Sequence, residues 1–201
     1  GMMDVPEMRR LARVQRFDFW IAVAAIAATL LVGVLAGVII GIGLSLIWLI
    51  FVATHPPMPV LAREPGTQVF RELDEHPGDE QFAGVTVLRL DGGLFFATAD
   101  AVEDRVREVA LSAPGSTAIV LDCGGMDFID SQGSAKMSEI LNLTKQAGVT
   151  LRLARLKPPV REVLERDGVL GRIGDDKIHG NVDHAVNAQL AVSGGHHADC
   201  E

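Results

Sequence analysis

The chain has 201 residues, a formal net charge of −8 and 48% hydrophobic residues. An acidic chain without clusters of Lys and Arg is a poor ligand for phosphate backbones, so we exclude nucleic acid as a partner. The two cysteines, Cys123 and Cys200, lie in very different sequence settings. We expect no disulfide between them, which suits a reducing cytoplasm.

The first feature in chain order is a stretch without charged residues or proline at residues 19–54. A single helix of this length would extend about 54 Å, whereas a hydrocarbon core is roughly 30 Å thick and one crossing needs about 20 residues. Two short crossings with a turn near residues 33–37 fit better. We therefore predict a transmembrane helical hairpin at residues 17–54, after a cytoplasmic lead at residues 1–16.

Basic residues before the hairpin indicate its orientation. They are Arg9, Arg10, Arg13 and Arg16. The positive-inside bias places this flank in the cytoplasm, and a chain that crosses twice returns there. We therefore expect a multi-pass protein of the cell inner (plasma) membrane with a cytoplasmic C-terminal domain. A signal peptide is the alternative, but its apolar core would be only about 7–15 residues long.

Glycines punctuate the second half of the apolar stretch, among them Gly37 and Gly41. Small residues let membrane helices approach closely, although glycine is also simply common in such helices. We interpret Gly37 and Gly41 as packing positions, with membrane lipid and further helices as partners.

Residues 55–80 are interpreted as linker and edge structure. The proline-rich exit at residues 56–59 ends the second helix, because proline removes backbone donors and disfavours helix in the residue before it. Only residues 60–62 are expected to form a short strand.

Strand-like and helix-like segments alternate from residue 81 to residue 190, which we assign to one domain. We predict strands at 85–90, 117–121 and 149–153, a β-rich segment at 94–96, and helices at 100–111, 134–147, from 158 to about 168, and 182–190. This alternation predicts an α/β fold, a sheet flanked by helices. Residues 171–176 are interpreted as a turn, and residues 191–201 as a disordered tail.

The loop that follows the buried strand at 117–121 contains the candidate functional residues. Ser131 would lie at or just before the start of a helix, where free N–H groups and the positive dipole end favour a negative group such as a phosphate. Asp122 and Asp130 could hold a kinase or another protein by hydrogen bonds. The competing interpretation is structural, because Ser and Asp are common N-cap residues and Asp122 could simply end its strand.

Three carboxylates in this loop, Asp122, Asp127 and Asp130, could suggest a metal or a phosphoryl-transfer site, such as that of a phosphohydrolase using Asp122 and Asp130. No Lys or Arg lies within the loop to complete a phosphoryl-transfer site. We therefore predict that the chain is not an enzyme and has no catalytic residue, metal or cofactor. A histidine pair in the tail, His196 and His197, is interpreted as solvated.

Several segments together resemble the C-terminal end of a SulP-type anion (sulfate) transporter. They are residues 17–22, the two glycine-punctuated apolar stretches, and residues 63–67, 94–97 and 127–133. In that family the last two membrane helices lead into a cytoplasmic STAS domain, a module shared with anti-sigma-factor antagonists. The resemblance implies a STAS-like mixed sheet with helices mostly on one side, at residues 81–190 here.

The resemblance also suggests a role for the loop. In anti-sigma antagonists the Ser after Asp in an Asp-Ser-Ser-Gly loop is phosphorylated, and this position matches Ser131, between Asp130 and Gly133; Gln132 replaces the second Ser. Asp122, Asp130 and Gly133 would then support a regulatory Ser131, with a regulatory protein binding at the loop.

SulP proteins carry sulfate, bicarbonate or other anions as dimers, and their STAS domain assists assembly, trafficking and regulation. We therefore expect a regulatory portion that works with the remaining transporter helices, as a homodimer formed through the transporter. The chain alone is not expected to transport, because the helices with the anion site are absent from it. The alternative is a membrane-tethered, anti-sigma-antagonist-like signalling module switched by phosphorylation of Ser131.

Overall fold

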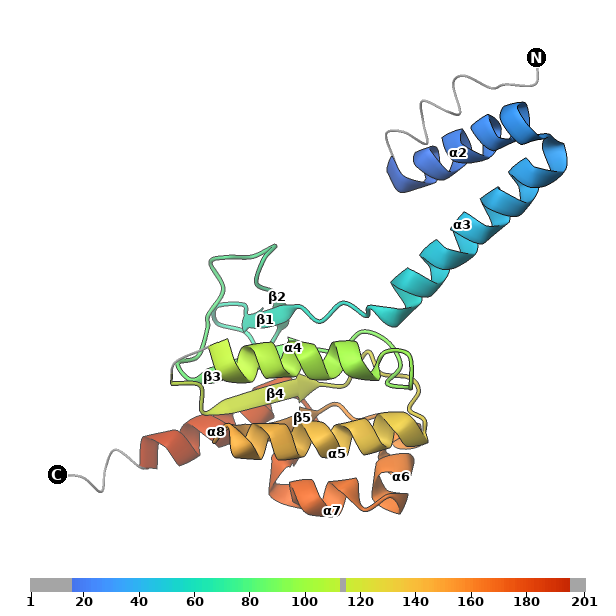
Figure 1. Cartoon of the computed structure of the whole chain (residues 1–201). Helices are drawn as coiled ribbons and strands as arrows, with labels where there is room; N and C mark the ends of the chain where they lie inside the picture. The colour runs from blue at the N-terminus through green and yellow to red at the C-terminus, as the bar shows by residue number, and fades with distance from the viewer. Residues whose placement is uncertain (1–15, 113–114, 196–201) are drawn as a thin grey trace. The chain divides into compact units, whose positions relative to one another are not determined.

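The computed structural model describes residues 16–112 and 115–195, which divide between Ala53 and Thr54 into two compact units (Figure 1). The first unit contains helices α2 (Arg16–Val32) and α3 (Val34–Thr54). The predicted cytoplasmic lead falls almost entirely outside the described residues.

A single residue, Gly33, separates the two apolar helices. Its φ of 114° lies in the region that favours glycine. The Gly33 N–H still donates to the Thr29 carbonyl (3.1 Å), and the Gly37 N–H donates to the Gly33 carbonyl (3.1 Å). The turn expected at residues 33–37 is therefore a single residue. As a result α3, with 21 residues, is longer than half of the apolar stretch.

The two helices differ in their capacity to cross a membrane. Among the described helices, α3 with 21 residues is the one that is long and apolar enough, whereas the apolar part of α2 is the shorter stretch Phe19–Leu31. A helix of this length extends about 31 Å, close to the thickness of a hydrocarbon core.

The second unit is built on a six-stranded mixed sheet with the order β2-β1-β3-β4-β5-β6. The strands are β1 (Val60–Arg63), β2 (Phe70–Glu72), β3 (Val85–Arg89), β4 (Ala118–Asp122), β5 (Thr150–Ala154) and β6 (Ile178–His179). β1 pairs antiparallel with β2 and β3, whereas β3 to β6 are parallel. The helices are α4 (Ala99–Ser112), α5 (Ser131–Gln146), α6 (Pro158–Arg166), α7 (Val169–Ile173), the 3₁₀ helix η1 (Asp175–Lys177) and α8 (Val182–Gly195).

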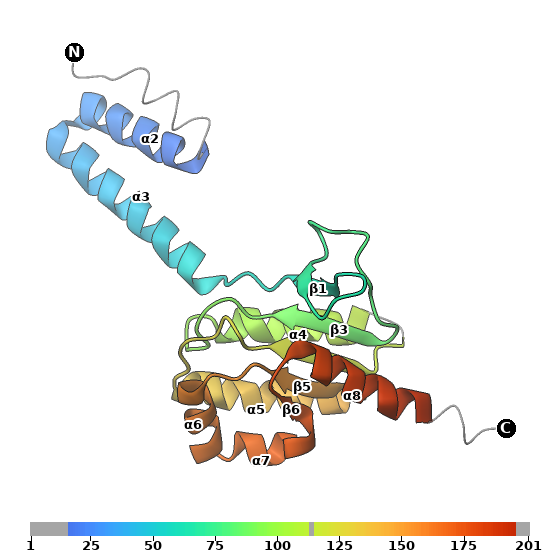
Figure 2. The ribbon, with the colours of Figure 1, turned by 180° about the vertical axis from the view of Figure 1, so that it is seen from behind.

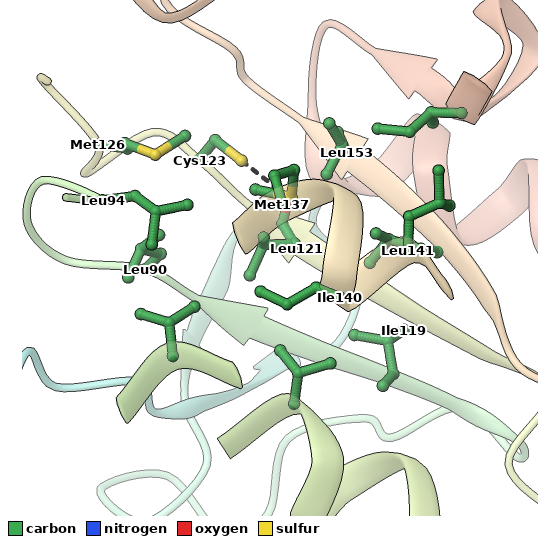
Figure 3. Close-up of a cluster of buried hydrophobic side chains, with 14 of the residues drawn as sticks. Leu90, Leu94, Ile119, Leu121, Cys123, Met126, Met137, Ile140, Leu141 and Leu153 are labelled. Carbon is green, nitrogen blue, oxygen red and sulfur yellow. Dashed lines mark hydrogen bonds between the residues drawn. The ribbon is translucent and has the colours of Figure 1, made fainter. Parts of the chain in front are cut away.

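The larger core lies between the sheet and helices α4 to α7. On this face Ile119 and Leu121 of β4 and Leu153 of β5 pack among Met137 and Ile140 of α5 (Figure 3). Full burial of an aliphatic side chain of this size stabilises the fold by about 1.5–3 kcal/mol. This layer therefore fixes α5, whose first residue is Ser131, against the sheet.

A smaller core covers the opposite face, where α8 packs alone (Figures 1 and 2). Val182 and Val186 of α8 are buried with Val87 of β3 and Val120 of β4. The alternation along β4 explains both layers, because neighbouring residues of a strand point to opposite faces. The mixed sheet with helices mostly on one side agrees with the fold class expected from the sequence.

Several elements differ from the sequence predictions. The stretch expected as linker and edge structure supplies both β1 and β2, and β1 is internal to the sheet. Residues 94–96 form no regular strand; Leu94 makes an isolated bridge to Ile129. α7 and η1 occupy residues expected as a turn. α8 continues to Gly195, so residues 191–195 are helical and not a disordered tail.

Candidate functional site

The candidate loop follows β4, the most buried strand of the sheet. All five β4 residues are buried, because β3 and β5 flank the strand and helices cover both its faces. Continuous apolar runs are typical of such strands. The strand ends at Asp122, and the loop of residues 123–130 leads directly into α5, so the sheet places the loop at the carboxyl edge of its parallel strands.

Asp130 caps α5. Its backbone is extended, and its Oδ1 accepts a hydrogen bond from the Gly133 N–H (2.7 Å). Its second oxygen, Oδ2, accepts from the Phe96 N–H (3.3 Å). The structural interpretation of Asp130 is therefore confirmed, and the same carboxylate also fixes the loop between β3 and α4.

Backbone contacts join these two loops. The Leu94 N–H donates to the Phe128 carbonyl (2.9 Å), and the Asp130 N–H donates to the Leu94 carbonyl (3.3 Å). A Cβ added at Gly133 would lie 2.0 Å from the Leu94 carbonyl oxygen. Gly133 is therefore needed for this close approach, which gives it a packing role.

Ser131 is the first residue of α5 and is exposed. Within the described part of the chain its hydroxyl makes no hydrogen bond, and neither do the N–H groups of Ser131 and Gln132. A cavity of about 320 Å³ opens beside it, lined by Ile129, Asp130, Ser131, Ser134, Val163, Arg166 and Asp167. The buried Ser134 hydroxyl is engaged, because it donates to Asp167 Oδ2 (2.7 Å).

Asp122 is completely buried and paired. Its Oδ1 accepts from the Gly124 N–H (3.0 Å) and from Arg155 Nε (2.7 Å), and Arg155 Nη2 bonds to Oδ2. This bonding raises the pKa of the Arg155 guanidinium above its ordinary value. A Cβ at Gly124 would lie 2.7 Å from Arg155 Cζ, so the guanidinium also covers the loop backbone.

The loop has no Lys or Arg of its own, but basic residues from the segment after β5 contact it. Besides Arg155 at Asp122, Lys157 forms an ion pair with Asp127. Sequence reasoning missed both residues. Their position in the sequence, directly after a predicted strand, could have indicated them. That strand, β5, pairs in parallel with β4, so that Asp122 lies opposite Ala154. Among the described residues no group of three or more His, Cys, Asp or Glu could hold a metal ion.

Cys123 lies beneath the loop, and Cys200 falls outside the described residues. The Cys123 side chain is free and buried, and its thiol donates to the Leu121 carbonyl (3.6 Å; Figure 3). Burial raises the pKa of this thiol far above its ordinary value, so it remains protonated.

The two candidate packing glycines lie where α3 faces α2 within the first unit. A Cβ at Gly37 would lie 1.8 Å from Thr29 Oγ1, and one at Gly41 would lie 3.4 Å from the Ala25 Cβ. Around them is a cavity of about 310 Å³ lined by Ala25, Ile26, Thr29, Leu30, Gly37, Val38 and Gly41. The described contacts are within the hairpin; packing against further helices stays a prediction.

The mixed sheet, the two-layer helix arrangement and the capped loop before α5 together define a STAS-type domain. The family model described as STAS domain matches residues 76–185, which is more than half of the chain. The chain therefore belongs to the STAS domain family.

Sequence relatives extend this match into the apolar segment. A probable sulfate transporter of Mycobacterium tuberculosis is 31% identical over 188 residues, 93% of this chain and 34% of that protein. Probable sulfate transporter 4.2 of Arabidopsis thaliana is 28% identical over 196 residues, 92% of this chain and 29% of that protein. The chain thus spans about a third of the length of these relatives, which are transporters rather than enzymes.

Solved structures share the fold. The murine Slc26a9 anion transporter in its inward-facing state matches 92% of this chain and 31% of its own, with a TM-score of 0.74 and 20% identity. The SulP transporter STAS domain from Vibrio cholerae matches 61% of this chain and 94% of its own, with a TM-score of 0.50 and 19% identity. The apolar helix α3 and the transporter relatives together support a membrane location.

Proposed function

We propose that this chain is the C-terminal regulatory portion of a SulP-type sulfate or anion transporter. In this proposal α2 and α3 are its last two membrane helices, and the STAS domain lies in the cytoplasm. The observation that carries the proposal is continuity: sulfate transporters match both the apolar hairpin and the STAS domain in one alignment covering more than nine-tenths of this chain.

The link between the two parts suits a regulatory role. Just after α3 ends, the Pro57 carbonyl accepts from the Asp91 N–H (3.5 Å), and the Pro59 carbonyl accepts from the Arg89 N–H (3.1 Å). The exit from the membrane segment is therefore hydrogen-bonded to the end of β3. A change in the transporter helices would reach the sheet through only a few residues.

The membrane segment itself is suited to packing rather than conduction. Residues 19–54 contain no charged side chain, and Gly37 and Gly41 face the neighbouring helix. We propose that the remaining transporter helices carry the anion, that the hairpin packs against them, and that the transporter assembles as a homodimer.

A chimera tests this function. The chain is fused to the Mycobacterium tuberculosis relative in place of the segment that it matches, and labelled sulfate uptake is measured in cells that lack their own sulfate transporters. We expect uptake well above that of the relative without the segment. A chimera that reaches the membrane but takes up no more sulfate than this truncation would contradict the proposal.

A matched pair of variants isolates the hairpin. Gly37→Val places bulk against Thr29, whereas Gly43→Val meets nothing within 4 Å inside this chain. If packing within the hairpin supports assembly, the first change lowers uptake and the second leaves it nearer to that of the parent chimera.

We further propose that Ser131 is a phosphorylation site through which a regulatory protein acts on the transporter. The support is its exposure and the two N–H groups of the first turn without described partners. A phosphate there would meet the positive end of α5 and lie near Arg166, which lines the same cavity.

Charge placement tests this regulatory site. Ser131→Asp in the chimera should change uptake or its response to cell extract, while Ser131→Ala should abolish phosphate incorporation detected by mass spectrometry. Gln132→Glu is the control, because it adds the same charge to the next exposed position of the same turn. Equal behaviour of Ser131→Asp, Gln132→Glu and the parent, with Ser131 always unmodified, would count against regulation here.

A further inference from the structure

An aromatic patch lies on the loops next to the candidate site. It consists of Phe95 and Phe96 from the β3–α4 loop and Phe128 from the β4–α5 loop. The ring centroid of Phe95 lies 5.8 Å from that of Phe96 and 6.3 Å from that of Phe128. Phe96 is 73% exposed and Phe128 is 56% exposed. Grouped, exposed aromatic rings of this kind mark an interaction surface.

The patch adjoins the place where the chain leaves α3. Pro56 lies two residues beyond Thr54, and its Cβ would be 3.6 Å from a Cβ added at Gly92. Gly92 lies in the loop that holds Phe95 and Phe96. Since a residue spans at most about 3.6 Å of extended chain, the two-residue step from Thr54 to Pro56 limits how far the end of α3 can lie from Pro56.

Two ion pairs flank the patch. Lys157 bonds to Asp127, the neighbour of Phe128. Arg89 bonds to Asp91 (2.6 Å), the neighbour of Gly92. The rings themselves carry no charge, and the Asp130 carboxylate beside them is bonded to the Phe96 N–H. Such a surface suits the boundary between headgroups and acyl chains, where aromatic and apolar side chains bind by burial.

We infer that the aromatic patch contacts the lipid–water interface of the bilayer that α3 crosses. This inference rests on the membrane insertion of α3 in the proposed function. The contact is made by burial of rings, so it requires neither anionic lipid nor low salt. It brings the Asp130–Ser131 turn close to the membrane surface, because Asp130 is bonded to the backbone of Phe96.

Spin labels on the full chain test this contact. Single cysteines replace Phe96, Phe128, Leu111 or Leu46 in a Cys200→Ser background, where the buried Cys123 is inaccessible to the reagent. Leu111 is the matched control, since it is 68% exposed but lies near the far end of α4. Leu46 in α3 reports membrane insertion. The proteins are reconstituted in phosphatidylcholine bilayers, and label access to oxygen and to a water-soluble nickel chelate is measured.

We expect nickel access at positions 96 and 128 to be at least threefold lower than at position 111, with higher oxygen access and no dependence on salt. Phe96→Ser should raise nickel access of a label at position 128. Nickel access equal to that at position 111 would overturn the inference while leaving sulfate uptake by the chimera intact. Labels that neither reagent reaches would show a protein partner and also overturn it. A water-exposed label at position 46 would refute membrane insertion and this contact together.

Discussion

The carboxylate of Asp122 and the guanidinium of Arg155 join the carboxyl ends of two neighbouring parallel strands through a two-point ion pair. The residues are 33 positions apart in sequence, and Asp122 is completely buried. Arg155 is also the one non-glycine residue with positive φ in the described chain, at 56°. The pair therefore holds both the loop before α5 and the turn before α6.

Breaking this pair should destabilise the domain. Arg155→Met leaves a buried carboxylate without its cation, and we expect a loss of about 3 kcal/mol in the free energy of unfolding, at the low end for buried pairs because the Arg155 side chain is 47% exposed. Urea unfolding of residues 54–201 measures it. Arg161→Met is the control: it removes an exposed pair within α6, which should cost under about 1 kcal/mol. Equal losses would contradict the role of burial.

A methyl group at Gly133 should separate the two loops. The close approach to the Leu94 carbonyl oxygen forces a backbone shift, so Gly133→Ala should destabilise the domain by about 1–3 kcal/mol. Gly171→Ala in α7 meets nothing within 4 Å and should be neutral or slightly stabilising. Thermal unfolding of both variants, followed by circular dichroism, compares them; an unchanged midpoint for Gly133→Ala would contradict the structure.

Alanine substitutions at Asp130 and Ser131 should differ sharply in their effect on the free energy of unfolding. Asp130→Ala removes the N-cap of α5 and the bond to the Phe96 N–H, with an expected cost of about 1–2 kcal/mol. Ser131→Ala removes a hydroxyl without a partner in the described chain and should change stability by less than about 0.5 kcal/mol. The denaturant concentration at the midpoint of unfolding, compared at the same dependence of unfolding free energy on denaturant, measures both effects. A large effect of Ser131→Ala would make that residue structural.

Acid should weaken the contact between α4 and α5. Glu103 of α4 is bonded to Lys136 of α5 (2.7 Å), and this bond lowers the pKa of the Glu103 carboxyl. The unfolded chain then binds the proton more readily, so stability from this pair is present above the unfolded pKa of about 4.3 and is lost as pH falls through the lower folded value.

Glu103→Gln should therefore reduce the slope of unfolding free energy against pH below about pH 5. Glu108→Gln is a suitable comparison, because Glu108 is 60% exposed and pairs with Arg105 inside the same helix. Unfolding titrations at a series of pH values test this expectation. Identical slopes for Glu103→Gln and the parent protein would show that the α4–α5 pair is not formed in solution.

A disulfide should form between α2 and α3 at one pair of positions. A Cβ at Gly41 lies 3.4 Å from that of Ala25, near the separation of about 3.5–4.5 Å that a disulfide requires. Ala25→Cys with Gly41→Cys should form an intramolecular disulfide in membranes, whereas Ala25→Cys with Gly43→Cys should not, since Gly43 has no neighbour within 4 Å. Gel mobility before and after reduction distinguishes the two, and equal cross-linking would imply that the helices are not held in this register.

The periodicity of apolar residues was enough to predict most of the secondary structure. The strands at β3, β4 and β5 and the helices α4, α6 and α8 were all predicted near their observed positions, because their buried residues recur with clear spacing. The start of α5 was predicted three residues late. Its apolar face begins only at Met137, whereas the helix itself begins after the Asp130 cap.

Elements without such a pattern were missed. β6 has two residues, too few for any periodicity, and it forms because β5 offers a free parallel edge. Phe95 and Phe96 suggested a strand by composition, but their loop is held by Asp130 from another segment. The cations at the site, Arg155 and Lys157, follow β5 in the sequence. They lie near the loop only because β5 is the neighbour of β4 in the sheet, and local sequence does not encode this strand order.

The antiparallel pairing of β1 has a mechanical consequence. Its ladder bonds run across the strand, to β2 on one side and β3 on the other, and Arg63 at its far end is tied to Glu80 (2.8 Å) and Asp183 (3.2 Å). Tension applied at Thr54 along the axis of β1 would therefore load these cross-strand bonds in shear, so that they resist together. Such a force would pass from β1 to its neighbouring strands and, through the Arg63–Asp183 ion pair, to α8.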